Sequence, residues 1–593
     1  MKRSKAPARM AAGLAVTGLS LLGIGWTSSA LAAPACESLG TDPQYGLANN
    51  PVIKSVTSVR KATPAPANVQ YCAVTLVYGT EPSQNITIAV GLPLNAVDGG
   101  TGGTQGAWNG RTEGLGGGGC SGNLNVNAAV NAGYVGSGTD GGHSGGDCTP
   151  GVNPDGTYNL GFIEDWSRVG LKQEILLSKQ IAATYYDQQP VYNYWNGCST
   201  GGRQGYLLAQ ELGNELEGIL ASAPAMYWTR FQTAQMWGQI AMRELANETP
   251  TGAISPAKLA AVQKAAVAAC DANDGAADGI IDDPRTCSFD ANANVCGAPT
   301  APAAPNCLTP TEATAVNRIW DGPRNAKGDR IWFPLDRGSD FSILDGPAPF
   351  ALGVVQLEWD EHDLAFANLW KELTLADYPQ VAQDGSRNIA DVTDTFGPLD
   401  TFKQHGGKLL TFVGGNDQFI YPRGVLNYYR LMASRYRAPH DQTGFEGVQN
   451  FYRLFHAPGV GHCGLPVLSL GTDGPWPQNG ADFQALVNWV EHGAAPSQVI
   501  GNGTGRLAQA PAGTPVTPLT RPLCAYPQTA EYKGSGNVFD AANWSCGGNL
   551  ETTQAVCPDV LVRYKHEVLG NLDYEGSGVL PASCVSNGRN GGN

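Results

Sequence analysis

The sequence has few charged residues and few histidines for its length. Asp, Glu, Lys and Arg make up 15% of the 593 residues, and only eight histidines are present. Acidic residues outnumber basic ones, and the formal charge of −15 would be repelled by phosphate backbones, so no nucleic-acid partner is expected. Hydrophobic residues nevertheless make up 42%, which is enough for a large core and excludes disorder as the main state.

Long apolar runs are scarce as well. The one candidate, residues 10–26, follows four basic residues and precedes Ala-Leu-Ala at 30–32. Glycines and Thr17 interrupt it, so it indicates a secretory signal peptide cut near Ala32 rather than a membrane anchor. Removing residues 1–32 takes away four cations and no acid, which changes the net charge from −15 to −19. We predict a secreted protein, periplasmic or extracellular, that has no membrane contact after cleavage.

The cysteines include no Cys-x-x-Cys pair, which disfavours a zinc site. There are fourteen of them, none in the predicted signal peptide. Because an exported chain meets an oxidising compartment, up to seven disulfides are expected.

Short β-rich runs alternate with amphipathic stretches over much of the chain. Two of these stretches, 204–212 and 482–491, are predicted helices. Strands that alternate with helices predict an α/β fold with a parallel sheet covered on both faces. The β-rich runs lie at 191–195, 218–221, 408–413 and 451–455.

The alternation breaks down between residues 225 and 401, where Trp-rich, Pro-rich and Cys-containing stretches indicate an inserted lid. Beyond residue 522 the tail has four cysteines and little periodicity, which suggests a disulfide-stapled wrap rather than a separate domain. The predicted organisation is a signal peptide at 1–32, the first part of the core at 33–224, the lid at 225–401, and the second part of the core with the tail at 402–593.

A Gly-x-Ser-x-Gly pattern at 197–201 supplies a candidate nucleophile, Ser199. This pattern is typical of the strand-to-helix turn that presents a serine above an α/β sheet. A second match at 142–146, around Ser144, is followed by Asp-Cys-Thr-Pro rather than by helix-forming residues. The context therefore favours Ser199.

A serine hydroxyl is a poor nucleophile until a base takes its proton and a third group orients that base. In this class of fold the expected chain order is serine, acid, histidine. Asp417 follows the β-rich run at 408–413 and is the candidate acid. Its alternative role is that of an ordinary turn aspartate.

Five histidines follow Ser199 by more than 200 residues. His462 is the preferred base because it lies in a Gly-rich loop just beyond a β-rich run. His456, at the end of that run, fits a core histidine, and His492 fits a cation at a helix C-terminus. The five are His405, His440, His456, His462 and His492.

Two cysteines adjoin the chosen serine and histidine. Cys198 precedes Ser199, and Cys463 follows His462. If the serine and histidine lie within hydrogen-bond reach, their neighbours are also close, and a disulfide needs Cα atoms only about 4.4–6.8 Å apart. A bridge between them would lock the base to the nucleophile.

An oxyanion needs backbone N–H donors held in place before the reaction. One is expected from Thr200, directly after the nucleophile, and one from the glycine run at 114–119. We interpret this run as a close approach of two backbones rather than as a flexible linker.

Five aspartates crowd the loop at 271–283, which is bracketed by Cys270 and Cys287. Their mutual repulsion would destabilise the loop unless a cation is bound. From Asp274 the loop resembles half an EF-hand, although Arg285 stands where that motif ends in glutamate. We predict a structural calcium site, and the alternative is a solvated acidic turn.

These motifs together resemble those of the tannase and feruloyl esterase family, which includes MHETase. The similarity covers most of the mature chain, and it implies an α/β-hydrolase core, a calcium-binding lid inserted after the nucleophile, and Ser199, Asp417 and His462 as catalytic residues. Its motifs are Cys-Ser at 198–199, Asp417, His-Cys at 462–463, Trp-Asn-Gly-Arg at 108–111, Thr-Asp-Gly-Gly-His at 139–143, the acidic loop, Arg-Pro-Leu-Cys at 521–524 and Tyr-Lys-Gly-Ser-Gly at 532–536.

The resemblance also implies roles for individual residues. It implies Gly116 and Thr200 as oxyanion donors. The implied calcium ligands are Asp271, Asp274, Asp278 and the backbone carbonyls of Ala276 and Ile280. The implied disulfides are Cys198–Cys463, Cys36–Cys72, Cys270–Cys287, Cys296–Cys307 and Cys524–Cys546. The resemblance leaves the pairing of Cys120, Cys148, Cys557 and Cys584 open, and of the three possible pairings we prefer Cys120–Cys148 with Cys557–Cys584.

The predicted activity is that of a secreted serine carboxylesterase that hydrolyses feruloyl or other hydroxycinnamoyl esters, free or attached to plant cell-wall polysaccharide. The alternatives are a tannase acting on gallate esters, an MHETase-like hydrolase of terephthalate half-esters, and a calcium-stabilised binding protein without turnover. Residues 351–400 contain no clear counterpart of the lid arginine that holds the free carboxylate of a terephthalate half-ester. Four aromatic residues of the lid could have either of two roles: they could stack on the acyl group of the substrate, or they could form the core of the lid. They are Tyr227, Trp228, Phe231 and Trp237.

Overall fold

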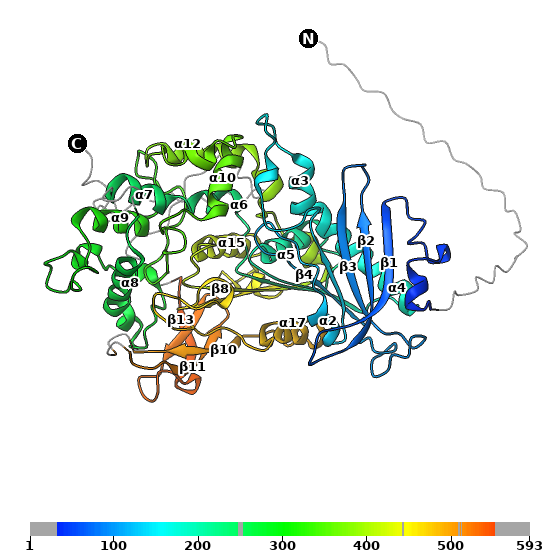
Figure 1. Cartoon of the computed structure of the whole chain (residues 1–593). Helices are drawn as coiled ribbons and strands as arrows, with labels where there is room; N and C mark the ends of the chain where they lie inside the picture. The colour runs from blue at the N-terminus through cyan, green and yellow to red at the C-terminus, as the bar shows by residue number, and fades with distance from the viewer. Residues whose placement is uncertain (1–32, 247–252, 442–443, 508–509, 511–512, 552–593) are drawn as a thin grey trace, which may run out of the picture.

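The computed structural model describes residues 33–246, 253–441, 444–507, 510 and 513–551, so the predicted signal peptide lies outside the described residues. A mixed sheet of nine strands, in the spatial order β1-β2-β3-β5-β4-β6-β7-β8-β9, forms its centre (Figure 1). The strands are β1 Ile53–Ala62, β2 Gln70–Tyr78, β3 Ile86–Pro93, β4 Arg111–Leu115, β5 Val135–Thr139, β6 Tyr192–Cys198, β7 Gly218–Ser222, β8 Lys408–Gly414 and β9 Tyr452–Ala457.

The sheet has an antiparallel and a parallel part. Strands β1, β2, β3 and β5 pair antiparallel in turn, and β5, β4, β6, β7, β8 and β9 run parallel. All five residues of β7 are buried, as expected for a strand covered on both faces. The four predicted β-rich runs form β6 to β9, so the predicted α/β fold is confirmed.

Helices cover both faces of the sheet and enclose separate cores. Figure 1 shows α2 and α17 below the sheet, with α5 and α15 above it. Leu486 and Trp489 of α17 pack with Leu410 and Phe455 of the strands on one face, while α4, α5 and α15 contribute to the cores on the other. The helices outside the insert are α1 Cys36–Leu39, α2 Asn127–Asn131, α3 Leu160–Glu164, α4 Gly170–Tyr186, α5 Thr200–Glu211, α14 Asp400–His405, α15 Pro422–Arg435, α16 Glu446–Gln449 and α17 Ala481–His492.

A helical insert separates the neighbouring strands β7 and β8. Its helices α6 and α10 pack together, as do α7 and α9 (Figure 1). Local sequence sets where they begin: a capping box formed by Thr309 and Glu312 starts α9, and Ser255 caps α8. The helices are α6 Trp228–Ala234, α7 Trp237–Ala246, α8 Pro256–Cys270, α9 Pro310–Asp321, α10 Ala351–Glu361, α11 Phe366–Leu369, α12 Tyr378–Asn388 and α13 Ala390–Thr393.

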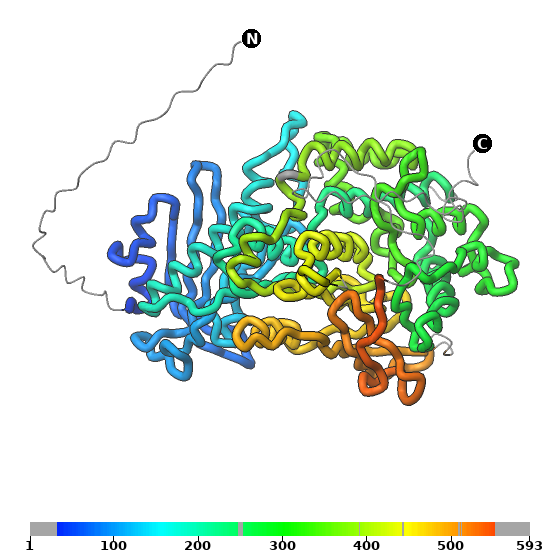
Figure 2. Tube along the Cα trace, turned by 180° about the vertical axis from the view of Figure 1, so that it is seen from behind, coloured from blue at the N-terminus to red at the C-terminus, as the bar shows by residue number. Residues whose placement is uncertain are grey.

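Two antiparallel hairpins follow the last core helix. Figure 2 shows them, in orange, against the green insert. Ala276 of the acidic loop packs with Trp544 of the second hairpin, and the fully buried Arg521 reaches Asp278 and Asp282 of the same loop. The described part of the tail is thus anchored to the insert. The strands are β10 Gln498–Gly505, β11 Thr517–Cys524, β12 Gln528–Tyr532 and β13 Trp544–Asn549.

Six disulfides join cysteines whose Cα atoms lie 5.0–6.0 Å apart. Five of them are the pairings that the family resemblance implies, the sixth, Cys120–Cys148, is the preferred pairing of the cysteines left open, and Cys557–Cys584 lies outside the described residues. In the part of the chain that is described, no helix is both long and apolar enough to cross a membrane. The six are Cys36–Cys72, Cys120–Cys148, Cys198–Cys463, Cys270–Cys287, Cys296–Cys307 and Cys524–Cys546.

Candidate active site

Ser199 occupies a tight turn between the end of β6 and the start of α5. Its φ of 62° lies in a region that non-glycine residues seldom adopt. The Ser199 amide donates to the carbonyl of Ser222 on the next strand, at 3.0 Å. A Cβ on Gly197 would lie 2.5 Å from backbone atoms of Gly201. A side chain at position 197 would therefore clash across the turn, and a Cβ on Gly201 would lie a tight 3.1 Å from the backbone of Gly116.

Asp417 and His462 form a buried pair at the ends of β8 and β9. His462 Nδ1 lies 2.8 Å from Asp417 Oδ2. The other carboxylate oxygen accepts the amides of Phe419 and Ile420, both at 2.9 Å. These bonds hold the carboxylate in one orientation and direct the second imidazole nitrogen, Nε2, away from the aspartate.

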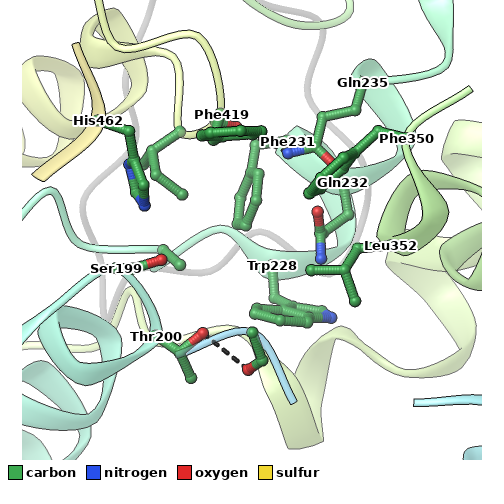
Figure 3. Close-up of a pocket in the computed structure, with 13 residues that line it drawn as sticks. Ser199, Thr200, Trp228, Phe231, Gln232, Gln235, Phe350, Leu352, Phe419 and His462 are labelled. Carbon is green, nitrogen blue, oxygen red and sulfur yellow. Dashed lines mark hydrogen bonds between the residues drawn. The ribbon is translucent and has the colours of Figure 1, made fainter. Parts of the chain in front are cut away.

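Ser199 and His462 line the same cavity. Figure 3 shows the imidazole directed toward the serine. The disulfide between the adjoining residues, Cys198 and Cys463, holds their Cα atoms 6.0 Å apart. No hydrogen bond joins Ser199 Oγ to His462 within the described part of the chain. Such bonds often become short and linear only when substrate is bound.

The other candidates lie away from this cavity. Ser144, of the second Gly-x-Ser-x-Gly match, is exposed in a bend. His456 is half-buried on β9, opposite Val413 of β8, and its removal from solvent lowers its pKa to about 4. His405 and His492 lie at the C-terminal ends of α14 and α17, and His440 is exposed. The structure thus brings together the serine, acid and histidine that the sequence analysis preferred.

The cavity has a volume of about 150 Å³ and mostly apolar walls. Of the four lid aromatics, Trp228 and Phe231 line it (Figure 3), whereas Tyr227 stacks on Phe396 and Trp237 packs against Tyr378 inside the lid. The lining residues are Gly119, Ser199, Thr200, Ala225, Trp228, Phe231, Gln232, Gln235, Phe350, Leu352, Phe419, Ile420 and His462.

The backbone around Thr200 is suited to bind an oxyanion. Thr200 is the first residue of α5, where amides have no acceptor within the helix and attract negative charge. The prediction for Gly116 is wrong, because its amide donates to the carbonyl of Asn196 at 3.0 Å in continuation of the β4–β6 ladder. Gly119 is the glycine of that run that lines the cavity. The predicted close approach is real, since a Cβ on Gly116 would lie 2.4 Å from Gly201 Cα.

Two buried glutamates lie beneath the site, and no sequence motif marks them. Glu113 on β4 accepts the side-chain amide of Asn196 at 2.9 Å, and burial raises its pKa to about 7. Glu174 on α4 accepts the hydroxyl of Ser137 at 3.0 Å, and burial raises its pKa to about 8. Both carboxyls favour the protonated form more than exposed glutamates do.

The acidic loop is a buried cluster of carboxylates. Asp271 Oδ1 accepts the amides of Asp278, Gly279 and Ile280 at 2.9–3.1 Å. Burial and, to a smaller extent, the nearby carboxylate of Asp278 together raise the pKa of Asp271 to about 7. Burial likewise raises the pKa of Asp274 to about 6.

One guanidinium group faces this cluster. Arg521 lies 3.0 Å from Asp278 and 2.7 Å from Asp282. A single cation does not balance the three buried carboxylates of Asp271, Asp278 and Asp282 and the half-buried one of Asp274, and the remaining negative charge is of the kind that a further cation would neutralise. In the described residues, however, no three Asp, Glu, His or Cys side chains converge as they would around a metal. The implied calcium set reaches five ligands only with the backbone carbonyls of Ala276 and Ile280.

The doubly covered parallel sheet, the strained serine after a central strand, and the aspartate–histidine pair at the ends of the next two strands define an α/β-hydrolase. The sequence profile of "Tannase and feruloyl esterase" matches residues 104–358 and 353–547. The chain therefore belongs to the tannase and feruloyl esterase family, and it is a carboxylic ester hydrolase. The alternative of a binding protein without turnover is not supported.

Similar proteins share this fold over most of their length. A probable feruloyl esterase of Arthroderma benhamiae is 31% identical over 483 residues, which cover 78% of this chain and 83% of the relative. A tannin acyl hydrolase from Aspergillus niger superposes with a TM-score of 0.69 at 22% identity, over 84% of this chain and 92% of that one. Feruloyl esterase B from Aspergillus oryzae superposes with a TM-score of 0.68 at 23% identity, over 86% of this chain and 100% of that one.

Proposed function

We propose that this chain is a secreted serine esterase that cleaves esters of phenolic acids, feruloyl and other hydroxycinnamoyl esters in particular. The observation that carries the proposal is an aromatic-walled cavity with Ser199 and His462 at one end, in a chain whose relatives are named feruloyl esterases. Trp228, Phe231 and Phe350 offer flat apolar surface to an aromatic acyl group.

The reaction follows from the placement of the groups. Ser199 Oγ attacks the ester carbonyl carbon while His462 Nε2 takes its proton, and Asp417 stabilises the resulting imidazolium. The backbone amide of Thr200 and those of the turn that contains Gly119 stabilise the negative charge on the carbonyl oxygen. His462 then protonates the leaving alcohol oxygen, which leaves the acyl group on Ser199. A water molecule, deprotonated by His462, attacks this ester and releases the phenolic acid.

The calcium site is part of the proposal and is structural. When bound, Ca²⁺ would neutralise charge and cross-link the loop, with Asp271, Asp274 and Asp278 and the carbonyls of Ala276 and Ile280 as ligands. Support comes from the burial of the Asp271 and Asp278 carboxylates and from the raised pKa of Asp271. The loop contacts the C-terminal hairpins through Arg521, so the ion would tie the insert to the tail.

Export is supported by the six disulfides, which persist in oxidising compartments. The predicted cleavage near Ala32 is tested by N-terminal sequencing of the protein recovered outside the cytoplasm. A product that begins at Met1 would contradict it. Release of ferulate from feruloylated arabinoxylan oligosaccharides tests whether polysaccharide-linked esters are also substrates.

The substrate proposal is tested with a panel of methyl ferulate, chlorogenate, methyl gallate and a terephthalate half-ester. We expect hydrolysis of the hydroxycinnamoyl esters by the wild type and loss of turnover in Ser199→Ala. Ser144→Ala is the matched control, because it alters the other Gly-x-Ser-x-Gly serine, and it should remain fully active. Turnover of gallate alone would assign the chain to tannases, and unchanged turnover in Ser199→Ala would refute the assignment of the nucleophile.

A further inference from the structure

Two glutamine side chains interrupt the apolar wall that the lid contributes to the cavity. Gln232 lies on α6, and Gln235 caps its C-terminal end. Both side chains are almost fully buried, with 2% and 1% of their surface exposed. Figure 3 shows both on the far side of the cavity from Ser199 and His462. They are therefore placed where the distal end of an acyl group would lie.

The amide oxygens of both glutamines are left without a hydrogen-bond partner among the described residues. For Gln235 the orientation of the amide is determined, because its nitrogen donates to the carbonyl of Phe419 at 2.9 Å. Its oxygen is consequently a free acceptor. A buried acceptor without a partner is destabilising, so one that lines a binding cavity indicates a ligand that donates a hydrogen bond.

We propose that Gln235, with Gln232 beside it, recognises the phenolic hydroxyl of the acyl group, an inference that rests on the proposed function. The ring lies between Trp228, Phe231 and Phe350, and its hydroxyl donates to the amide oxygen of Gln235. An aryl methyl ether has no proton to donate, so it leaves this acceptor unpaired and adds a methyl group at the same place.

The same arrangement disfavours a carboxylate at the distal end of the ring. None of the described residues that line the cavity is lysine or arginine, and His462 lies at the opposite end. A terephthalate half-ester would place its negative charge against amide oxygens in an apolar, desolvated wall. Selectivity thus arises from acceptors that favour a neutral phenol and oppose an anion.

The test compares kcat/KM for methyl ferulate with kcat/KM for its 4-O-methyl ether, methyl 3,4-dimethoxycinnamate. The wild type should prefer the phenol by about 10- to 100-fold. Gln235→Met keeps the length of the side chain and removes the acceptor, so this preference should fall to within a few-fold of unity. Gln232→Met should reduce it less, because no hydrogen bond to another described residue determines the orientation of the Gln232 amide.

Gln239→Met is the matched control. Gln239 on α7 is equally buried and also has an unpartnered amide oxygen, but it does not line the cavity. This variant should lose stability to a similar degree and keep the wild-type preference for the phenol. A preference that falls equally in Gln239→Met would show a general effect of lid packing and overturn the proposal.

If Gln235→Met does not fold, the comparison of the two esters with the wild type alone still tests the proposal. Equal kcat/KM for the phenol and its methyl ether would overturn the role of Gln235 while leaving the esterase function intact. Absence of Ser199-dependent turnover on both esters would instead refute the proposed function. Faster hydrolysis of the terephthalate half-ester than of methyl ferulate would also overturn the inference.

Discussion

Breaking the disulfide that joins the nucleophile segment to the base segment should reduce both stability and turnover. Cys198 and Cys463 are separated by 265 residues, and each adjoins a proposed catalytic residue. The chain-entropy relation for a loop of this length gives about 5.6 kcal/mol of stabilisation. The two cysteines of the Cys296–Cys307 disulfide are only 11 residues apart in the sequence. For this shorter loop the same relation gives about 3 kcal/mol of stabilisation.

The second disulfide therefore provides the control. Cys198→Ala/Cys463→Ala should lower the free energy of unfolding by about 3 kcal/mol more than Cys296→Ala/Cys307→Ala does, measured in guanidinium at pH 7. It should also lower kcat about 10- to 100-fold at a temperature where both variants are folded, because small displacements of Ser199 from His462 misalign proton transfer. The control variant should keep wild-type kcat.

Two results would refute this reasoning. If Cys198→Ala/Cys463→Ala keeps kcat within twofold of the wild type, the bridge is a structural cross-link and the surrounding turns position the catalytic groups. If this variant is no less stable than the control variant, the stability lost on removing a disulfide does not depend on the length of the loop that the disulfide closes.

The remaining predictions concern the acid, a buried carboxyl and the metal. Asp417→Asn should lower kcat by about 10⁴ with little change in KM, because the imidazolium loses its counter-charge; a loss below tenfold would contradict its role. Burial raises the pKa of Glu174 to about 8, so folding should become less favourable as the pH rises from about 5 to 8. Glu174→Gln should make thermal unfolding less dependent on pH over that window, and an unchanged dependence would argue against a raised pKa. EDTA should lower the midpoint of thermal unfolding, and added Ca²⁺ should restore it. Asp274→Asn should weaken this response, and an unfolding midpoint that is insensitive to EDTA would remove the calcium proposal.

Much of the core and of the site is encoded locally and could be predicted. The runs that form β7 and β8 are almost wholly buried and mostly apolar, those of β6 and β9 are rich in aromatic residues, and the serine turn has glycines on either side of Ser199. Strand β5, Val-Gly-Ser-Gly-Thr, has no such signature. It packs close to neighbouring elements, and a Cβ on Gly136 would lie 2.9 Å from Ala129. Its burial therefore depends on small size rather than on hydrophobicity.

Other features depend on register or on contacts between distant segments. The glycines at 116–119 are identical in sequence, and only the pairing of β4 with β6 determines that the Gly116 amide is used in the ladder. Gln235 and Phe350 come from separate parts of the insert, so no local pattern places them in one cavity wall. Arg521 reaches the acidic loop from the tail, which no spacing within that loop could indicate.

The most direct test of the account is to identify the residue that carries the acyl group during turnover. Wild-type protein is mixed with methyl ferulate, quenched in acid within milliseconds, digested and analysed by mass spectrometry. The account predicts one feruloyl group on the peptide that contains Ser199, linked by disulfide to the peptide that contains His462, and no such adduct in Ser199→Ala. An adduct on another residue, or hydrolysis by the wild type with no adduct at Ser199 at any quench time, would contradict it.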